Sequence, residues 1–227
     1  MPLKEYRKKR RFDVTPEPSG KQATAVKPKH KLVYVVQKHR ATSLHYDLRL
    51  EWNGVLLSWA VPKGPSTDPS VKRLAMQVED HPLDYASFEG TIPEGEYGGG
   101  TVMVWDIGTW EPESPDVNAA LEKGDLKFIL YGKKLRGSWV LVRTRGFGSS
   151  SKPSWLLIKH RDQYASTDDI TVTKPKSVVS ARLLAQIARD GGGDVAKAAT
   201  GDPQKAPSKA SAPAKKRAKT AAKRTSK

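Results

Sequence analysis

The sequence of 227 residues contains no cysteine. Disulfides, thiolate metal sites and cysteine nucleophiles are therefore excluded, and any bound metal must have nitrogen and oxygen ligands. Long apolar runs are also missing, and no charged segment followed by an apolar one opens the chain, so we expect a cytoplasmic protein without membrane contacts. Hydrophobic residues make up only 37% of the sequence, which indicates that part of the chain does not fold.

Acidic residues are scarce relative to basic ones, and the imbalance is concentrated toward the C-terminus. The formal net charge is +16. From Lys174 onward there are 14 Lys and Arg residues against three Asp residues, whereas residues 1–173 carry 26 basic and 21 acidic residues. Each phosphate that a protein neutralises releases counterions, so this balance favours a polyanionic partner such as nucleic acid. The alternative is that the basic tail only keeps the protein soluble.

Composition divides the chain into three parts. Residues 1–30 mix a basic cluster with prolines, which indicates an N-terminal arm that is either disordered or laid over a core. Residues 31–190 carry the patterns of a folded domain. Residues 191–227 consist largely of Ala, Lys, Pro, Ser and Thr, and such a segment cannot bury enough surface to offset its chain entropy. We expect this tail to be disordered and to tether the protein to DNA backbones.

Short β-branched and aromatic runs, separated by Gly, Pro, Asn and Asp, predict a mainly β domain. Asn53-Gly54 lies between two such runs and predicts a hairpin with a type I′ turn. Many short strands with turn residues between them are typical of a β-barrel or a sandwich, with most tryptophans in the core. Helical patterns are confined to residues 116–124 and 180–191, where we expect Ser180 to cap the second helix and Gly191 to end it.

The stretch HRATSLHYDLRL, residues 39–50, places charge in a run that otherwise suits a strand. On a strand His45, Asp47 and Arg49 project from one face at a spacing of about 6.6 Å. His39 joins that face only if residues 41–43 remain extended. The opposite face carries an apolar stripe suited to a core, formed by Leu44, Tyr46, Leu48 and Leu50.

Two imidazoles and one carboxylate can form a metal site that keeps open positions for substrate or water, with His39, His45 and Asp47 as ligands. Arg49, one strand step beyond Asp47, would bind a phosphate held by that metal, because its planar guanidinium suits two phosphate oxygens. The alternative is that these residues form the solvated face of an ordinary amphipathic strand.

Other polar residues near strand ends can gather over the same groove. They are Lys63, Arg73, His81, Asp84 and Tyr85. A histidine before a proline is usually structural and an isolated surface cation is usually solvated, so their shared location alone makes them candidates. The segment GTIPEGEYGGGTV lacks the Gly-Lys-Ser/Thr end of a phosphate loop and runs into a strand, so Gly98–Gly100 better suit a bulge or a tight strand entry.

Taken in order, these residues resemble the 3′-phosphoesterase domain found in bacterial DNA ligase D and in free-standing homologues. The matching runs extend from about residue 6 to residue 190 and are FDVTPEP, VVQKHRATSLHYDLRLEWNGVLLSWAVPKGPS, VEDHPLDYASFEGTIPEGEYGGGTVMVWDIGTW, LRGSWVLVR and WLLIK. The resemblance implies a single small β-barrel of about eight strands with a manganese site in a groove on one side, to which the helical patterns above add one or two short helices. Other divalent transition metals also suit this donor set.

The resemblance also implies roles for individual residues. His39, His45 and Asp47 match the family's metal ligands. The positions that contact the phosphate or assist the reaction match Arg49, Lys63, Arg73, His81 and Tyr85. The N-terminal arm contributes a glutamate that matches Glu17 and an arginine that matches Arg10 or its neighbour. The family usually has an acidic residue where this sequence has Arg11, a departure that bears on the contribution of the arm.

The activity implied by the resemblance is the healing of 3′ ends of DNA or primer strands during repair and end joining. The family removes a 3′-terminal ribonucleoside and then hydrolyses the remaining 3′-phosphate to a 3′-hydroxyl. His81 is expected to act as a general acid or as a donor to the phosphate. The sequence after residue 190 is too short for a ligase or polymerase domain. We therefore expect a stand-alone protein at the bacterial or archaeal nucleoid that works with separate ligase, polymerase or Ku-like proteins. The alternative is a catalytically silent barrel that binds DNA ends or a repair partner.

Overall fold

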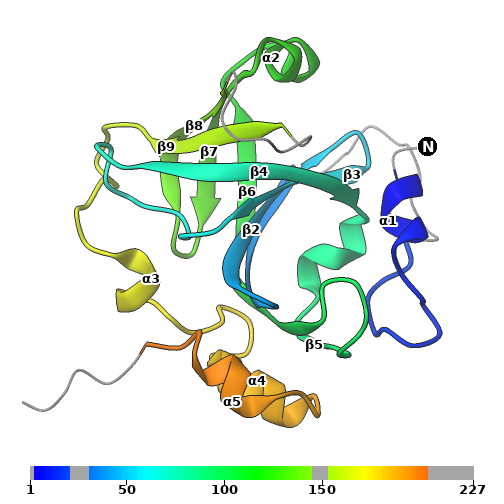
Figure 1. The fold of residues 1–227 in the computed structure, drawn as a ribbon. Helices are drawn as coiled ribbons and strands as arrows, with labels where there is room; N and C mark the ends of the chain where they lie inside the picture. The colour runs from blue at the N-terminus through cyan, green and yellow to red at the C-terminus, as the bar shows by residue number, and fades with distance from the viewer. Residues whose placement is uncertain (1–2, 21–30, 145–152, 204–227) are drawn as a thin grey trace, which may run out of the picture.

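A computed structural model describes residues 3–20, 31–144 and 153–203, and in them nine strands form one antiparallel sheet that closes on itself (Figure 1). Eight strands complete the ring in the order β1-β2-β3-β4-β9-β8-β7-β6, and β6 pairs again with β1. The predicted eight-stranded barrel is therefore confirmed. The strands are β1 Val33–Arg40, β2 Leu44–Trp52, β3 Val55–Val61, β4 Lys72–His81, β5 Gly90–Ile92, β6 Gly100–Pro112, β7 Asp125–Gly132, β8 Arg136–Arg143 and β9 Ser154–Lys159.

The long strand β6 closes the barrel and also carries an extra strand. One of its edges pairs with β1 along most of its length, while the other edge pairs first with β5 and then with β7. Gly100, the first residue of β6, lies close to the backbone at the end of β1: it has a φ of +147°, and a Cβ there would overlap the Arg40 carbonyl oxygen. The glycine-rich segment therefore serves a tight strand entry, as the sequence predicts.

Two hairpin turns set the register of the strands that carry the candidate residues. Asn53 and Gly54 both have positive φ, at 50° and 79°, so the turn between β2 and β3 has the predicted left-handed conformation. Residues 41–43 do not remain extended but form the bend between β1 and β2. This bend pairs His39 directly with His45. Directly opposed residues share a face of the sheet, so His39 joins the candidate group across the hairpin rather than along one strand.

The barrel interior is filled by the apolar face of these strands. Tyr46, Leu48 and Leu50 are buried there as the alternation predicts, and Leu44 packs against the same cluster. Five of the six tryptophans are fully buried, which confirms their core assignment. A second apolar cluster lies on the outside of the sheet, where the arm and η1, a 3-10 helix at Leu83–Ser87, cover strands β1, β3 and β6. Tyr85 of this outer cluster also lines the cavity described below.

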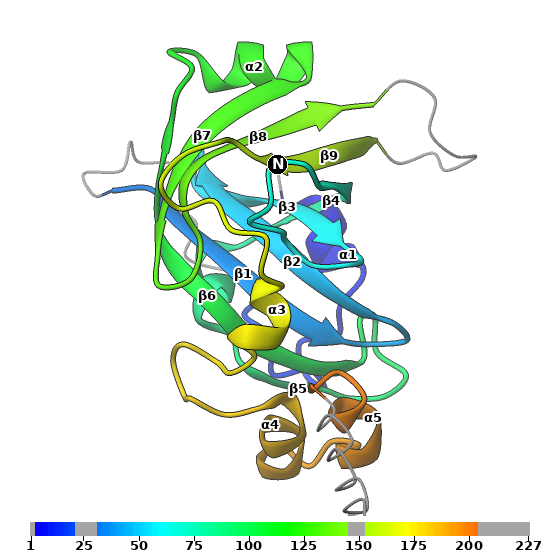
Figure 2. The same ribbon diagram turned by 90° about the vertical axis from the view of Figure 1, so that its left-hand side faces the viewer.

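The described residues contain five short α-helices, more than the one or two that the sequence indicates. They are α1 Lys4–Lys8, α2 Val117–Lys123, α3 Ile170–Thr173, α4 Leu184–Asp190 and α5 Val195–Ala199. Helix α2 begins after Asp116 and ends at Gly124, as predicted. Figures 1 and 2 show α2 at one end of the molecule and the pair α4 and α5 at the other. None of the helices in the described segments has the length and apolar character needed to span a bilayer.

The C-terminal end differs from the expectation in two respects. Helix α4 begins at Leu184 rather than after Ser180, although it does end at Gly191. Residues 191–203 are folded, because the carboxylate of Asp202 accepts hydrogen bonds from the backbone N–H groups of Leu184 and Ala185 and so caps α4. The expected start of the disordered tail at residue 191 was therefore too early, and its remainder, residues 204–227, lies outside the described residues.

Candidate metal and phosphate site

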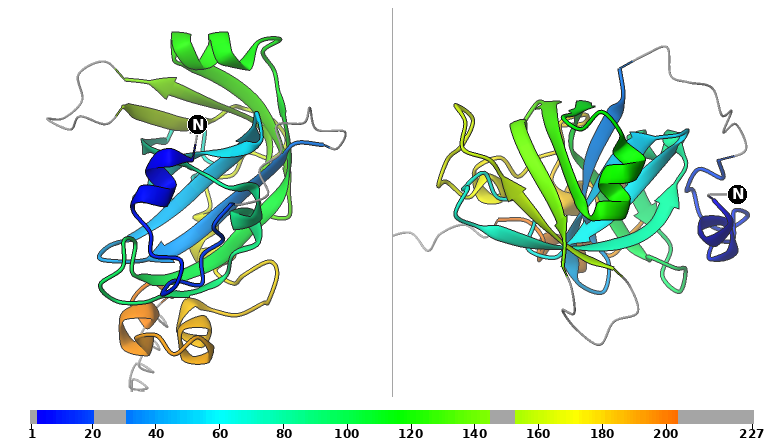
Figure 3. Two further views of the ribbon diagram at one scale, coloured as in Figure 1. Left: turned by 90° about the vertical axis from the view of Figure 1, so that its right-hand side faces the viewer. Right: turned by 90° about the horizontal axis from the view of Figure 1, so that it is seen from above.

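A cavity of about 170 Å³ lies on the outer face of the barrel, between strands β1 to β4, the N-terminal arm and the loop before β6. Figure 3 shows α1 of the arm standing outside the sheet on this side. Eight of the predicted site residues line the cavity: Arg10, Glu17, His39, His45, Asp47, Arg49, His81 and Tyr85. The structure therefore gathers residues that lie far apart in the sequence around one small polar space.

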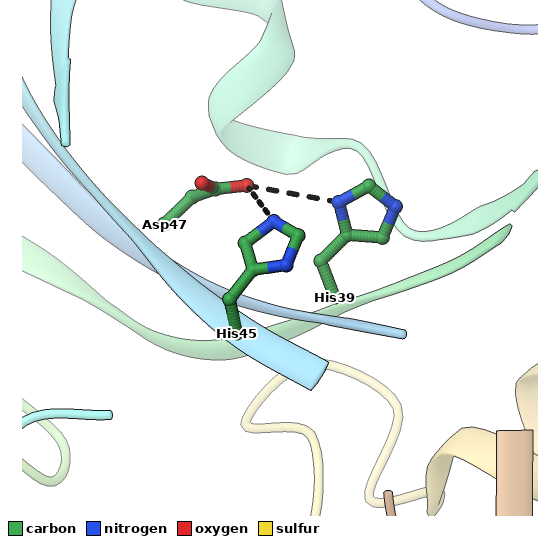
Figure 4. Close-up of side chains that lie close together, drawn as sticks. All are labelled: His39, His45 and Asp47. Atoms are coloured by element: carbon green, nitrogen blue, oxygen red, sulfur yellow. Dashed lines mark ion pairs between the residues drawn. The ribbon is translucent and has the colours of Figure 1, made fainter. Parts of the chain in front are cut away.

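His39, His45 and Asp47 form a compact set of three candidate ligands (Figure 4). One donor atom from each lies within 4.8 Å of the others. His39 Nδ1 is 3.8 Å and His45 Nε2 is 3.6 Å from the same oxygen, Asp47 Oδ2. These separations leave a common point at which one ion can contact all three atoms.

The second nitrogen of each imidazole is held by a backbone carbonyl. His39 Nε2 lies 2.9 Å from Gly98 O, and His45 Nδ1 lies 3.1 Å from Ser43 O. A carbonyl only accepts, so each of these nitrogens carries a proton, and in the neutral imidazoles the lone pairs are on His39 Nδ1 and His45 Nε2. Both lone pairs face Asp47. This arrangement is the outer-shell hydrogen bonding that orients metal-ligating histidines, and the donor set fits a divalent transition metal.

Charges around Asp47 keep its carboxyl group ionised. Burial alone would raise the pKa of Asp47, but the charge of Arg49 and the neighbouring imidazoles of His39 and His45 hold it well below the ordinary value of 3.8. Burial would likewise lower the pKa of His45, but Asp47 raises it above 6.5. The carboxylate is thus available as an anionic ligand throughout the neutral range.

Arg49 is fixed beside the three ligands by hydrogen bonds from every nitrogen of its guanidinium. Nε donates to Gln37 Oε1 at 2.8 Å, Nη1 donates to Ser58 Oγ at 2.9 Å, and Nη2 donates to Asp47 Oδ2 at 3.1 Å. Its Cζ also lies 4.9 Å from the ring centroid of Tyr85. A planar cation held in this way is oriented before any ligand arrives.

His81 lies between two guanidinium groups. Its Nδ1 is 3.0 Å from Arg49 Nη1 and its Nε2 is 3.2 Å from Arg10 Nη2. Burial, followed by the charges of Arg49 and Arg10, lowers the pKa of His81 well below 6.5. The imidazole is therefore neutral at pH 7. Its Nδ1 also lies 2.9 Å from Glu79 O, which favours a proton on Nδ1 and a lone pair on Nε2.

Glu17 connects the N-terminal arm to the cavity. Its Oε1 accepts hydrogen bonds from Arg10 Nε and from the Tyr85 hydroxyl, each at 2.9 Å, and its Oε2 accepts one from Thr15 Oγ1 at 2.9 Å. The side chain is fully buried. Because Arg10 also stacks 3.8 Å from the ring centroid of Tyr6, Glu17 and the arm together aim Arg10 at His81. Burial and Glu17 raise the pKa of Tyr85 well above 10, so its hydroxyl stays protonated.

Three predicted candidates do not line the cavity. Asp84 is exposed on η1. Lys63 is exposed in the turn after β3. Arg73 pairs with Leu157 at the far end of β4, where its charge acts on Asp169. The departure at Arg11 has a local explanation, because its exposed guanidinium forms an ion pair with Glu96 in the loop before β6. This ion pair between Arg11 and Glu96 therefore links the arm to the loop at the rim of the cavity.

Sequence reasoning missed three residues that hold the site together. Gln37 and Ser58 fix Arg49 from β1 and β3, and Glu79 accepts hydrogen bonds from Lys9 Nζ at 2.9 Å and from Arg10 Nη1 at 3.4 Å. Gln37 lies two positions before His39, so the alternation along β1 carried a signal for it. Ser58 had no such signal, since its position depends on the register between β2 and β3.

Comparisons with known proteins point in one direction. Residues 37–143 match the family described as the DNA ligase D 3′-phosphoesterase domain. The multifunctional non-homologous end joining protein LigD of Pseudomonas aeruginosa is 55% identical over 190 residues, which are 81% of this chain and 22% of that protein. LigD of Mycolicibacterium smegmatis is 40% identical over 71% of this chain and 21% of its own length. The corresponding DNA repair protein of Mycobacterium tuberculosis strain H37Rv is 44% identical over 63% of this chain and 18% of its own. The chain thus matches about a fifth of each relative.

Proposed function

Residues 37–143 belong to the DNA ligase D 3′-phosphoesterase domain family, and on this basis we propose that the chain is a metal-dependent phosphoesterase that heals the 3′ ends of DNA or primer strands. It removes a 3′-terminal ribonucleoside and hydrolyses the remaining 3′-phosphate to a 3′-hydroxyl. The observation that carries the proposal is the pair of backbone-held imidazoles whose free lone pairs converge on the oxygen of Asp47.

His39, His45 and Asp47 are the residues that would hold the metal, which we propose to be Mn²⁺ or another divalent transition ion. When bound, such an ion polarises a phosphate oxygen as a Lewis acid. The chain's own contribution is to fix the geometry of these ligands through Gly98 O and Ser43 O, so that little reorganisation accompanies binding.

Arg10 and Arg49 are the proposed phosphate-binding residues. Each guanidinium is anchored by carboxylates and neutral acceptors, and each keeps one Nη2 hydrogen without a partner among the described residues. A charged donor that is already oriented stabilises negative charge on a phosphoryl group as it develops. Tyr85 and Glu17 do not approach the phosphate in this proposal but position Arg10 and Arg49.

His81 is the proposed residue for proton transfer. Its neutral imidazole has Nδ1–H directed at Glu79 O, so Nε2 is the atom that takes up or delivers a proton. An incoming phosphate would offset the two guanidinium charges that now depress the pKa of His81, and so would favour the protonated form next to the leaving oxygen. Lys63 and Arg73 lie outside the cavity and have no part in this mechanism. We further propose that separate ligase, polymerase or Ku-like proteins act on the same ends.

The proposal is tested with a primer–template carrying either a 3′-phosphate or a 3′-terminal ribonucleotide. We expect purified protein with Mn²⁺ to convert both ends to a 3′-hydroxyl, with a 3′-phosphate appearing as an intermediate from the second substrate. His45→Ala should remove this activity, whereas His160→Ala, at a histidine beyond the end of β9, should retain it. Protein that leaves both ends unchanged under these conditions would instead support a silent DNA-binding barrel.

A further inference from the structure

A second and larger cavity, of about 400 Å³, lies at the opposite side of the barrel from the arm. It is formed by the turn between β7 and β8, by the segment from residue 164 to residue 174 that includes α3, and by Thr67. Figure 1 shows α1 and α3 on opposite sides of the barrel, so this cavity is separate from the candidate metal site. The family match does not extend to α3.

The lining of this cavity is strongly basic. Four cationic side chains and one carboxylate, that of Asp168, face it. Lys133 and Lys134 lie in the turn between β7 and β8, Arg136 is the first residue of β8, and Lys174 follows the end of α3. Cations that two separate segments direct into one concave space repel one another, and an anionic ligand relieves that repulsion.

Several hydrogen-bond donors in the cavity have no described partner. Arg136 uses only Nε, which donates to Gly132 O at 3.0 Å, and keeps both Nη atoms free among the described residues. The described residues likewise provide no acceptor for Lys174 Nζ or for the Tyr164 hydroxyl. A guanidinium fork, an ammonium and a hydroxyl in one cavity are the donors that proteins use to bind phosphate oxygens.

The walls of the cavity are held in place by an ion pair and by partly buried hydrogen bonds. Gly137 has a φ of +78° and makes room for Asp162, whose carboxylate accepts a hydrogen bond from Ser138 N at 2.8 Å and an ion pair from Lys159. On the other side, Thr67 and Ser166 exchange two hydrogen bonds of 3.1 Å. Tyr164 and Ser166 are thus presented to the cavity by a fixed loop.

Lys134 shows that cationic charge is already crowded here. Its Nζ donates to Lys174 O and Lys176 O and lies 4.2 Å from the ring centroid of Trp105. Burial lowers the pKa of Lys134 to about 7; Asp106 opposes the shift, and Lys38 and Lys174 add to it. A bound anion would restore the charge of this amine, which gives a further favourable contribution to binding.

We propose that this basic cavity binds phosphate groups of a DNA strand at a position away from the 3′ end that is being processed. The choice of DNA rests on the proposed function, while the anionic character of the ligand rests on the lining alone. Arg136 and Lys174 are the principal contacts, because both are exposed and both have unengaged donors. The site would hold the body of the substrate while its terminus reaches the metal site.

The test uses a short duplex closed by a hairpin loop at each end, which offers no 3′ end, and measures its affinity by fluorescence anisotropy without metal at several salt concentrations. The variant Arg136→Gln/Lys174→Gln is compared with Lys123→Gln/Lys127→Gln, which removes equal charge from exposed positions that line no described cavity. Loss of two phosphate contacts reduces the slope of log affinity against log salt by about 1.8. Between about 50 and 200 mM salt the affinity of the variant should therefore fall about tenfold less than that of the wild type.

An unchanged salt slope for Arg136→Gln/Lys174→Gln, or an equal change in the control variant, would overturn the proposal. A second result would also overturn the proposal. If inorganic phosphate raises the melting temperature of the wild type but not of the variant, while both proteins bind the closed duplex equally well, the ligand of the cavity is free phosphate and not DNA. Turnover of a 3′-phosphorylated trinucleotide should be the same in the wild type and both variants. This readout is independent of the closed duplex, so failure of the second site and failure of the proposed phosphoesterase are distinguishable.

Discussion

Replacement of Glu17 by glutamine tests whether a buried ion pair holds the arm in the site. Glu17 is fully buried and Arg10 is 5% exposed, with 2.9 Å between Arg10 Nε and Glu17 Oε1. Removing one partner of a buried pair costs about 3 to 5 kcal/mol, and the low end applies because Arg10 keeps Glu79 at 3.4 Å. At about 2 to 4 °C per kcal/mol for a domain of this size, the melting temperature should fall by about 6 to 12 °C.

The matched control is Glu96→Gln, which removes a carboxylate paired with an arginine that is 68% exposed. Glu96 itself is only 6% exposed, but water screens the charge of its exposed partner, so the pair contributes at most about 1 kcal/mol and the melting temperature should change by no more than about 4 °C. In the proposed enzyme, Glu17→Gln also loosens Arg10 and should lower kcat/KM by about 10- to 100-fold, the value of one oriented charged hydrogen bond. Calorimetric unfolding of both variants decides the matter: equal shifts, or a neutral Glu17→Gln, would refute the assignment of Glu17 as the buried anchor.

Three further predictions concern neighbouring parts of the fold. The pKa of His81 is lower in the folded than in the unfolded chain, so the unfolded chain takes up a proton first as pH falls below about 6.5. The difference in unfolding free energy between wild type and His81→Gln, measured by chemical denaturation, should therefore shrink between pH 7 and pH 5. A difference that stays constant over this range would contradict the prediction. Gly100→Ala should lower the melting temperature far more than Gly95→Ala. Both positions have positive φ, but only at Gly100 would the added Cβ overlap the Arg40 carbonyl oxygen. Similar melting temperatures for the two variants would rule out this close contact between Gly100 and Arg40. Truncation after residue 203 should weaken duplex binding and leave the melting temperature unchanged. Truncation after residue 190 should in addition lower the melting temperature, because it removes Asp202, which caps α4. If the two truncated proteins have the same melting temperature, the cap has no role in stability.

Local sequence patterns were sufficient for the strand that carries most of the site. Alternation alone places His45, Asp47 and Arg49 on one face and Tyr46 and Leu48 on the other, because the side-chain period of a strand is fixed by its backbone. The Asn53-Gly54 turn and the helix after Asp116 were equally accessible, since both depend on contacts between near neighbours.

Positions that depend on pairing between distant segments were harder to predict. The expectation that His39 needs an extended link failed, because the bend at residues 41–43 brings it opposite His45. Arg73 lies on β4 like His81, but eight residues earlier, and a strand rises by about 3.3 Å per residue, so a shared strand did not mean a shared cavity. Asp202 illustrates the same difficulty: composition suggested disorder after residue 191, yet one distant carboxylate satisfies two N–H groups of α4.

The central claim is that His39, His45 and Asp47 hold one divalent metal that the phosphoesterase reaction requires. Metal-free protein, prepared with a chelator, is titrated with Mn²⁺ while bound metal is followed by electron paramagnetic resonance and turnover is followed on a 3′-phosphorylated primer. Activity should rise from zero and saturate at one equivalent of bound Mn²⁺ in the wild type and in His160→Ala, and His45→Ala should neither bind the ion tightly nor turn over. Full activity in the chelator-treated protein, or tight stoichiometric Mn²⁺ binding by His45→Ala, would contradict the claim.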